Sequence, residues 1–83
     1  MERNDLINEI ADFCLGYRMF DKTVEIKNII DGIQQQINDV EFVEGLIHML
    51  TTKSKNHKNI DIEKLKELLL ELEKIRLDLE YKE

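Results

Sequence analysis

Apolar residues recur at spacings of three and four along most of the chain, and no proline interrupts them. Side chains at these spacings share one face of an α-helix, so the pattern predicts amphipathic helices. Four stripes separate by phase and by the polar segments between them. They are Leu6, Ile7, Ile10, Phe13, Cys14 and Tyr17; Ile26, Ile29, Ile30, Ile33, Ile37 and Val40; Phe42, Val43, Leu46, Ile47, Met49 and Leu50; and Leu65, Leu68, Leu69, Leu72, Ile75 and Leu79.

Capping residues predict where the first two helices begin. Asn4 precedes the first stripe and Asp21 precedes the second, and both side chains can accept hydrogen bonds from the unpaired amides of a first helical turn. The first helix is expected to end between Leu15 and Met19. Gly16 either ends it in the left-handed conformation or is tolerated inside it.

The second and third stripes are separated by a change of phase. Past Val40 the apolar face rotates by more than a quarter turn, and Asn38 followed by Glu41 has the spacing of a capping box. We therefore expect a new helix to start there. One long helix with a local kink is the alternative.

The clearest predicted loop is Thr51–Asn59, which contains no apolar residue, and either Asn59 or Asp61 caps the last helix. Short connections between the first three helices favour antiparallel neighbours. The predicted fold is all-α: residues 1–83 form a single helical domain, a small antiparallel bundle of four helices, or of three if the second and third merge.

Charge is unevenly distributed along the chain. Residues 1–44 hold ten acids and four bases, whereas residues 45–83 hold eight of each, so the whole net charge of −6 lies in the first half. Phosphates would be repelled by such an acidic half, which disfavours nucleic acid and suits a partner protein with a basic surface.

The expected compartment is the cytoplasm. No run of eighteen apolar residues is long enough to cross a membrane, and the first five residues lack the basic and apolar features of a signal peptide. Cys14 is the single cysteine, so no disulfide can form within the chain.

The sequence offers no set of residues for catalysis. Cys14 lies in an apolar stripe, where a packed core thiol is expected and an activated nucleophile is not. His48 and His57 match no metal-ligand spacing, and Glu44 with His48 is the spacing of an ordinary helix-surface pair. We therefore predict no catalytic, cofactor-binding or metal-binding residue, and no cofactor.

Two surfaces are candidates for partner binding. Glu2, Asp5, Glu9 and Asp12 follow spacings of three and four along one edge of the first helix. This edge is either a solvated flank, which is the simpler interpretation, or an acidic strip that faces a partner.

The lysines of the predicted loop lack interleaved aromatic residues and glycines, so a solvated connector is expected there.

The second candidate surface lies on the last helix. Leu70, Leu77 and Tyr81 are aligned roughly opposite its main apolar stripe, at spacings of seven and four. They are either ordinary exposed residues or an interface, which could join two copies of the chain as a homodimer.

These observations favour a small acidic protein-binding module without catalytic activity, which docks on another protein and inhibits or adapts it. Inhibitors, antitoxins, immunity proteins and anti-repressors share this size and class. Abundant Ile, Lys, Asn and Glu suit an AT-rich bacterial genome, a phage or a mobile element. The alternative is a dimeric nucleic-acid-binding transcriptional regulator, although no helix stands out as basic. An enzyme with an active site shared between subunits is a third alternative, for which no reactive residues can be named.

Overall fold

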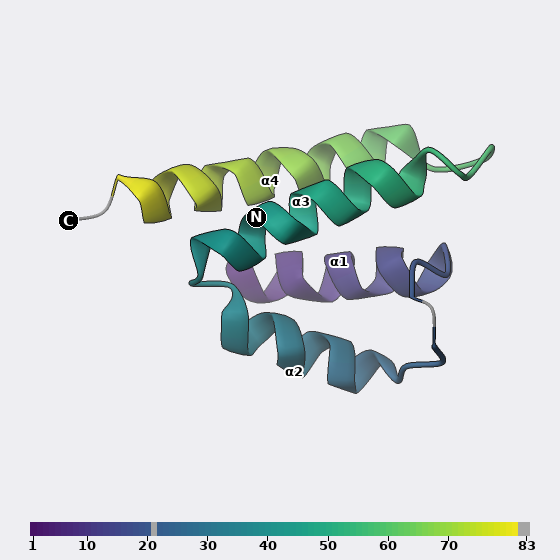
Figure 1. The fold of residues 1–83 in the computed structure, drawn as a ribbon, viewed down its shortest axis with the longest axis horizontal. Helices are drawn as coiled ribbons and strands as arrows, with labels where there is room; N and C mark the ends of the chain where they lie inside the picture. The colour runs from purple at the N-terminus through teal and green to yellow at the C-terminus, as the bar shows by residue number, and fades with distance from the viewer. Residues whose placement is uncertain (21, 82–83) are drawn as a thin grey trace.

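The computed structural model describes residues 1–20 and 22–81, and within these residues it contains α-helices and no strand (Figure 1). The helices are α1 (Arg3–Gly16), α2 (Ile26–Gln36), α3 (Val40–Ser54) and α4 (Ile62–Glu80). The predicted all-α bundle of four helices is confirmed, and so is the separation of the second and third helices.

The helices form two antiparallel pairs, as Figure 1 shows. One pair is α1 with α2, the other is α3 with α4, and α1 also packs against α4. Although α2 and α3 are consecutive in the chain, each packs chiefly on a different neighbour. This arrangement leaves the side of α2 that faces α3 without a close helical partner.

The core lies where the two pairs meet. Helix α1 contributes six buried side chains, α3 contributes three buried apolar ones and α4 three, whereas α2 contributes two, followed by Ile37 at its C-terminal end. The buried apolar residues are Leu6, Ile7, Ile10, Ala11, Phe13, Cys14, Met19, Ile29, Ile33, Ile37, Val43, Leu46, Leu50, Leu68, Leu72 and Ile75. Nearly all of them belong to the predicted stripes.

The beginnings of α1 and α2 differ from the prediction. Glu2 occupies the N-cap position of α1 without a side-chain cap bond, and its carbonyl accepts the first helical bond, from the Leu6 amide at 2.9 Å. Asn4 therefore lies inside the first turn, and its prediction as the cap is wrong. Asp21 lies outside the described residues, and α2 begins only at Ile26.

The turn before α3 is capped by a different residue from the predicted one. Asp39 Oδ1 accepts a hydrogen bond from the Glu41 amide at 3.0 Å, so the prediction of Asn38 as cap is wrong by one position. Asn38 instead accepts a hydrogen bond from Arg3 Nη1 at 2.7 Å. That contact joins the start of α1 to the turn between α2 and α3. Val40, predicted in the second stripe, is the first residue of α3.

Helix α3 extends into the predicted loop. The Thr51 hydroxyl donates to the Ile47 carbonyl at 2.8 Å, and the Ser54 hydroxyl donates to the Leu50 carbonyl, so both side chains bond within the helix. The loop is correspondingly shorter, covering residues 55–61. Asp61 caps α4, as one of the two predicted alternatives, by accepting from the amide three residues on at 3.0 Å.

The end of α1 is where the sequence predicts it, but the left-handed residue is Arg18, with φ 51°, and not Gly16. The Met19 amide donates to the Cys14 carbonyl at 2.9 Å, and the Arg18 amide donates to the Leu15 carbonyl at 3.2 Å. These two bonds form a Schellman motif, in which glycine is the favoured left-handed residue. Met19 then packs into the core.

Replacing Arg18 by glycine should stabilise the protein. Removing the Cβ relieves the strain of the left-handed conformation. The greater freedom of glycine in the unfolded chain offsets part of this gain, so the net increase in unfolding free energy should be about 0.5–1 kcal/mol. Urea denaturation measures it. Lys66→Gly, in the exposed interior of α4, is the matched control and should lower the unfolding free energy by about 1 kcal/mol. An equal loss in both variants would refute the assignment of Arg18.

Leu72→Ala should lower the unfolding free energy by about 2–5 kcal/mol, because Leu72 is completely buried in the middle of α4 and its truncation leaves a cavity. The measurement is the shift in the urea midpoint followed by circular dichroism. An unchanged midpoint would mean that the core face of α4 has been misplaced.

Candidate functional site

The side of α2 that faces α3 is poor in apolar surface. Asn28, Gly32 and Gln36 follow one another at spacings of four, and they line the space between the two helices. Two amides and a glycine offer little apolar area to bury. Helix α2 is instead held to α1 through Ile29 and Ile33, on its next face.

The facing side of α3 is apolar. Phe42, Leu46 and Met49 lie at spacings of four and three and line the same space. Leu46 is buried, whereas Phe42 and Met49 are only half-buried. Helix α2 presents Ile29 and Ile33 to the same space, but its row of Asn28, Gly32 and Gln36 adds little apolar cover. The mismatch between the two walls keeps α2 and α3 apart.

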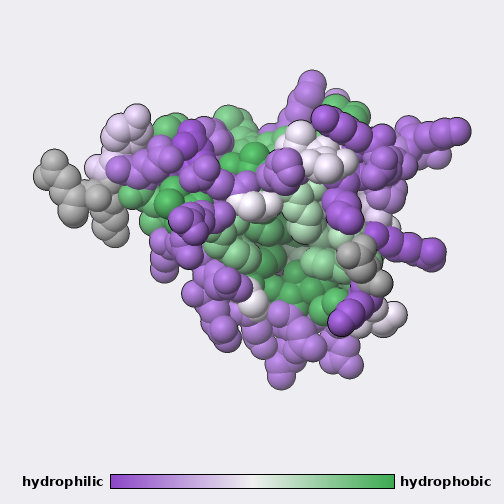
Figure 2. Space-filling view, viewed as in Figure 1, coloured by the Kyte–Doolittle hydropathy of each residue, from purple (hydrophilic) through white to green (hydrophobic). Residues whose placement is uncertain are grey.

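The result is an apolar groove of about 280 Å³ between α2 and α3. Figure 2 shows it as a hollow of hydrophobic surface bordered by hydrophilic residues. We call it the α2–α3 groove. Its lining comes from α1, the connection after it, α2 and α3, and consists of Cys14, Phe20, Val24, Asn28, Ile29, Gly32, Ile33, Gln36, Phe42, Leu46 and Met49.

The only thiol lies at the floor of the groove. Cys14 is 1% exposed, as the sequence predicts for a core residue, and burial raises its pKa to about 12. A thiol with such a pKa is almost entirely protonated near neutral pH, and the thiolate is the nucleophilic form. Cys14 therefore contributes apolar surface to this site.

Two helix-interior glycines lie in the helices that form the groove. Gly32 lines it from α2, and Gly45 lies on the exposed edge of α3 between Phe42 and Met49 at helical spacing. A Cβ built at either glycine meets nothing within 4 Å beyond its own helix backbone. Glycine costs about 1 kcal/mol relative to alanine inside a helix. Packing within the chain thus gives no reason for glycine at either place.

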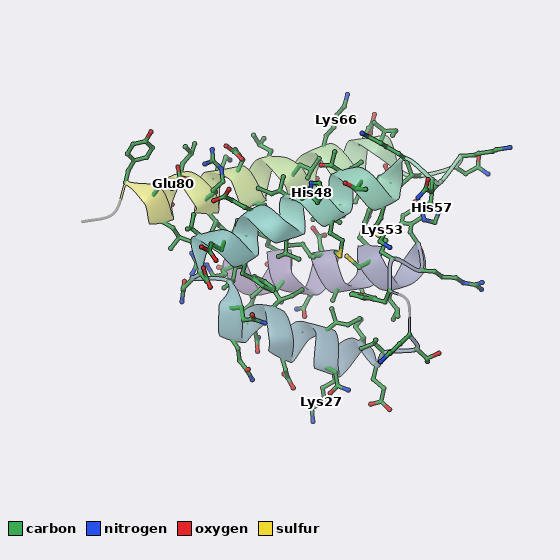
Figure 3. All side chains as sticks on the ribbon, in the orientation of Figure 1. Lys27, His48, Lys53, His57, Lys66 and Glu80 are labelled. Atoms are coloured by element: carbon green, nitrogen blue, oxygen red, sulfur yellow. The ribbon has the colours of Figure 1, made fainter. Side chains whose placement is uncertain are left out.

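Acidic residues border the groove. Glu25 is the N-cap residue of α2, Asp39 is the N-cap residue of α3, and Glu41 stands one turn before Gly45 on α3; all three acids are exposed. Residues 24–49, which include both helices, hold five acids and one lysine, a net charge of −4, although Glu44 lies on the side of α3 that faces α4. The one lysine, Lys27, projects from α2 away from the groove in Figure 3.

Lys53 lies in the last turn of α3, and Figure 3 shows it pointing toward the end of α1. Exposed acids thus lie near the α2–α3 turn, and a lysine lies at the opposite end of α3.

The predicted acidic strip is divided by an internal ion pair. Glu2, Asp5 and Asp12 are exposed on α1, whereas Glu9 is half-buried and bound to Lys64 of α4 at 2.6 Å. The hydrogen bond to the Glu9 carboxylate raises the pKa of the Lys64 ammonium. Glu9 therefore helps to join α1 to α4, and three of the four acids face solvent.

The predicted second apolar surface is exposed. Leu70, Leu77 and Tyr81 are 58%, 40% and 79% exposed on α4. None of these residues, and none of the acidic strip, lines the α2–α3 groove. The structure therefore places the predicted partner-binding residues on α1 and α4, separate from the α2–α3 groove.

The two histidines have structural neighbours. His48 Nε2 lies 3.5 Å from the Thr52 hydroxyl on the exposed side of α3. His57 stacks edge-on against Tyr17, whose hydroxyl accepts a hydrogen bond from the Asp61 amide at 2.9 Å. These contacts hold the loop between α3 and α4 against the end of α1. Figure 3 shows the two histidines far apart along the α3–α4 pair.

A polar depression of about 320 Å³ between α3 and α4 is occupied by paired charges. Its arginine, Arg76, forms ion pairs with Glu73 and with Glu80. The hydrogen bonds between Arg76 and Glu73 raise the pKa of the guanidinium and lower that of the Glu73 carboxyl. Because these charges satisfy one another, the depression is a weaker candidate than the groove.

Sequence reasoning missed the groove residues because it assigned the whole stripe of α3 to the core. Phe42, Val43, Leu46, Ile47, Met49 and Leu50 span about 160° of the helix circumference. A stripe that wide can face two neighbours. Two uncapped glycines inside predicted helices, Gly32 and Gly45, were the second available signal.

No protein family, curated protein or solved structure matches this chain. Within residues 1–20 and 22–81, no three His, Cys, Asp or Glu side chains come together as a possible metal site. None of the described helices is both long enough and apolar enough to cross a bilayer.

Gly32→Ala and Gly45→Ala should each raise the unfolding free energy by about 1 kcal/mol, because alanine favours the helix and its Cβ meets open space. Urea denaturation of both single variants and of the double variant measures this. A loss of stability in either single variant would show that a Cβ at that position clashes with the rest of the folded chain.

Proposed function

We propose that this protein is a non-catalytic binding module that docks on another protein through the α2–α3 groove. The single observation that carries the proposal is the incompletely covered apolar row of α3, in which Phe42 and Met49 are only half-buried. Apolar surface in a preformed hollow is typical of a binding site, and side chains from a partner would complete its burial.

The charge around the groove supports a partner with a basic surface around its apolar contact residues. Residues 24–49, which contain both walls, carry a net charge of −4, and the exposed Glu25, Asp39 and Glu41 lie at the ends of these two helices. Exposed charges of this kind add little affinity one by one, but together they accelerate the encounter with a basic partner and disfavour an acidic one. Inhibitors, antitoxins, immunity proteins and anti-repressors are the functional classes that such a module fits.

The absence of activated groups in the groove supports a role without catalysis. Its thiol has a pKa of about 12, and its other polar lining is two amide side chains. Neither an amide nor a protonated buried thiol supplies the nucleophile or general base that a reaction at this place would need.

The test is a change of charge inside the groove. The partner is cross-linked to the tagged protein in the source cell and co-purified with it. Met49→Glu places a carboxylate among apolar side chains, and it should reduce recovery of the partner by at least about tenfold. Leu77→Glu on α4 is the matched control and should retain the partner. Gly45→Gln, an uncharged addition on the exposed rim, repeats the test if Met49→Glu impairs folding measured by circular dichroism.

Three results would contradict the proposal. Capture that is unchanged by Met49→Glu and Gly45→Gln would exclude the groove. Capture that is lost only with Leu77→Glu would place the interface on α4. If nucleic acid and no protein is recovered, and if Met49→Glu and Gly45→Gln reduce that recovery, the transcriptional regulator would be supported instead.

A further inference from the structure

The shape of the α2–α3 groove restricts what can occupy it. Two antiparallel helices form its walls, and α2, with 11 residues, is about 16 Å long. A volume of about 280 Å³ accommodates a few side chains and is too small for a whole folded element. The occupant must therefore lie across the rims and insert side chains from one of its faces.

An amphipathic helix meets this requirement. A helix presents apolar side chains at positions i, i+3 or i+4, and i+7 along one stripe, and this is the usual way in which a helix fills a groove between two others. An extended segment that binds by strand addition would need a sheet edge, and the described part of the chain contains no strand. The groove geometry therefore favours a helical occupant.

The two glycines favour a helical occupant for a reason that is independent of the apolar lining. Gly32 lines the α2 wall, Gly45 stands on the edge of α3 one turn from Phe42 and Met49, and a Cβ built at either glycine meets nothing within 4 Å. Small residues allow the backbone of a second helix to come close. A helix resting on both rims would use the space that the fold itself leaves open.

Charge distinguishes a partner helix from a second copy of this chain. The exposed face of α4, with Leu70 and Leu77, is the obvious helix that another copy could offer. Helix α4 holds six acids and four bases, so its net charge of −2 would meet residues 24–49, which carry a net charge of −4. Like charges at an interface oppose association, whereas lysines or arginines beside an apolar stripe would pair with Glu25 and Glu41.

Resting on the function proposed above, we infer that the segment of the partner bound in the α2–α3 groove is a basic amphipathic α-helix of about three to four turns. Its apolar stripe inserts between Phe42 and Met49 on one wall and Ile29 on the other. Its basic flanks face the acidic rims, and its backbone passes close to Gly32 and Gly45.

The experiment uses three labelled peptides of about 14 residues with the full-length protein. The first has leucines along one helical face and lysines elsewhere, the second contains the same residues in scrambled order, and the third keeps the leucine face but replaces the lysines with glutamates. Fluorescence anisotropy measures each affinity. The first peptide should bind at least about tenfold more tightly than either of the others.

Matched variants locate the peptide. Gly32→Ala/Gly45→Ala should weaken binding of the first peptide by about tenfold while the fold remains intact, because two methyl groups lie between the helices. Glu25→Gln/Glu41→Gln should weaken binding and reduce its dependence on salt, whereas Glu63→Gln/Asp78→Asn, an equal charge change on α4, should do neither. Equal effects of the two charge pairs would overturn the assigned position.

The remaining outcomes separate this inference from the proposed function. If the scrambled or acidic peptide binds as tightly as the first, or if no peptide binds, the basic helix is wrong, even where Met49→Glu still abolishes capture of a partner protein. Loss of peptide binding in Leu77→Glu, together with self-association in sedimentation velocity, would assign the exposed leucines of α4 as the interface and overturn the inference.

Discussion

Helix α1 contacts both α2 and α4, and its two central residues, Ile10 and Ala11, are completely buried. This shared packing joins the two helical pairs, and the other contacts between them extend it. Glu9 reaches Lys64 on α4, and Arg3 reaches Asn38 at the turn after α2. Helix α1 packs against both α2 and α4. Helix α2 lies beside α3 without being packed tightly against it.

The groove follows from this arrangement and from the composition of one helix face. Had α2 carried apolar residues in place of Asn28, Gly32 and Gln36, the two walls would bury each other and the opening would close. The chain instead combines an apolar wall with a polar and small one, and keeps two glycines that lower helix stability. Natural sequences violate local stability rules most often at functional sites. The same residues that weaken the fold therefore define the place where we propose that a partner binds.

The sequence predicted the helices well because apolar periodicity directly records which face is buried. It predicted the ends less well. Thr51 and Ser54 look like loop residues, yet their hydroxyls bond to carbonyls one turn earlier and continue α3. Arg18 takes the left-handed position expected of Gly16, because the chain must turn where Met19 can enter the core. These choices depend on contacts between distant residues, which periodicity does not contain.

The groove could not be predicted for a related reason. Periodicity shows that Phe42 and Met49 lie on the apolar side of α3, but not which helix packs there, and the wide stripe was consistent with a fully covered helix. Leu70, Leu77 and Tyr81 were easier to identify, since they stand opposite the main stripe of α4 and are exposed. Whether those three residues bind anything stays a prediction.

The central claim is that the apolar row of α3 is covered by a partner helix and not by the chain itself. Nuclear Overhauser effects between the leucine methyl groups of a bound basic amphipathic peptide and the protein test it most directly. The chain has three methionines, which makes the Met49 methyl signal easy to assign. The account predicts contacts from the peptide to the Met49 methyl group and the Phe42 ring. Contacts to Leu70 and Leu77 in their place would contradict it.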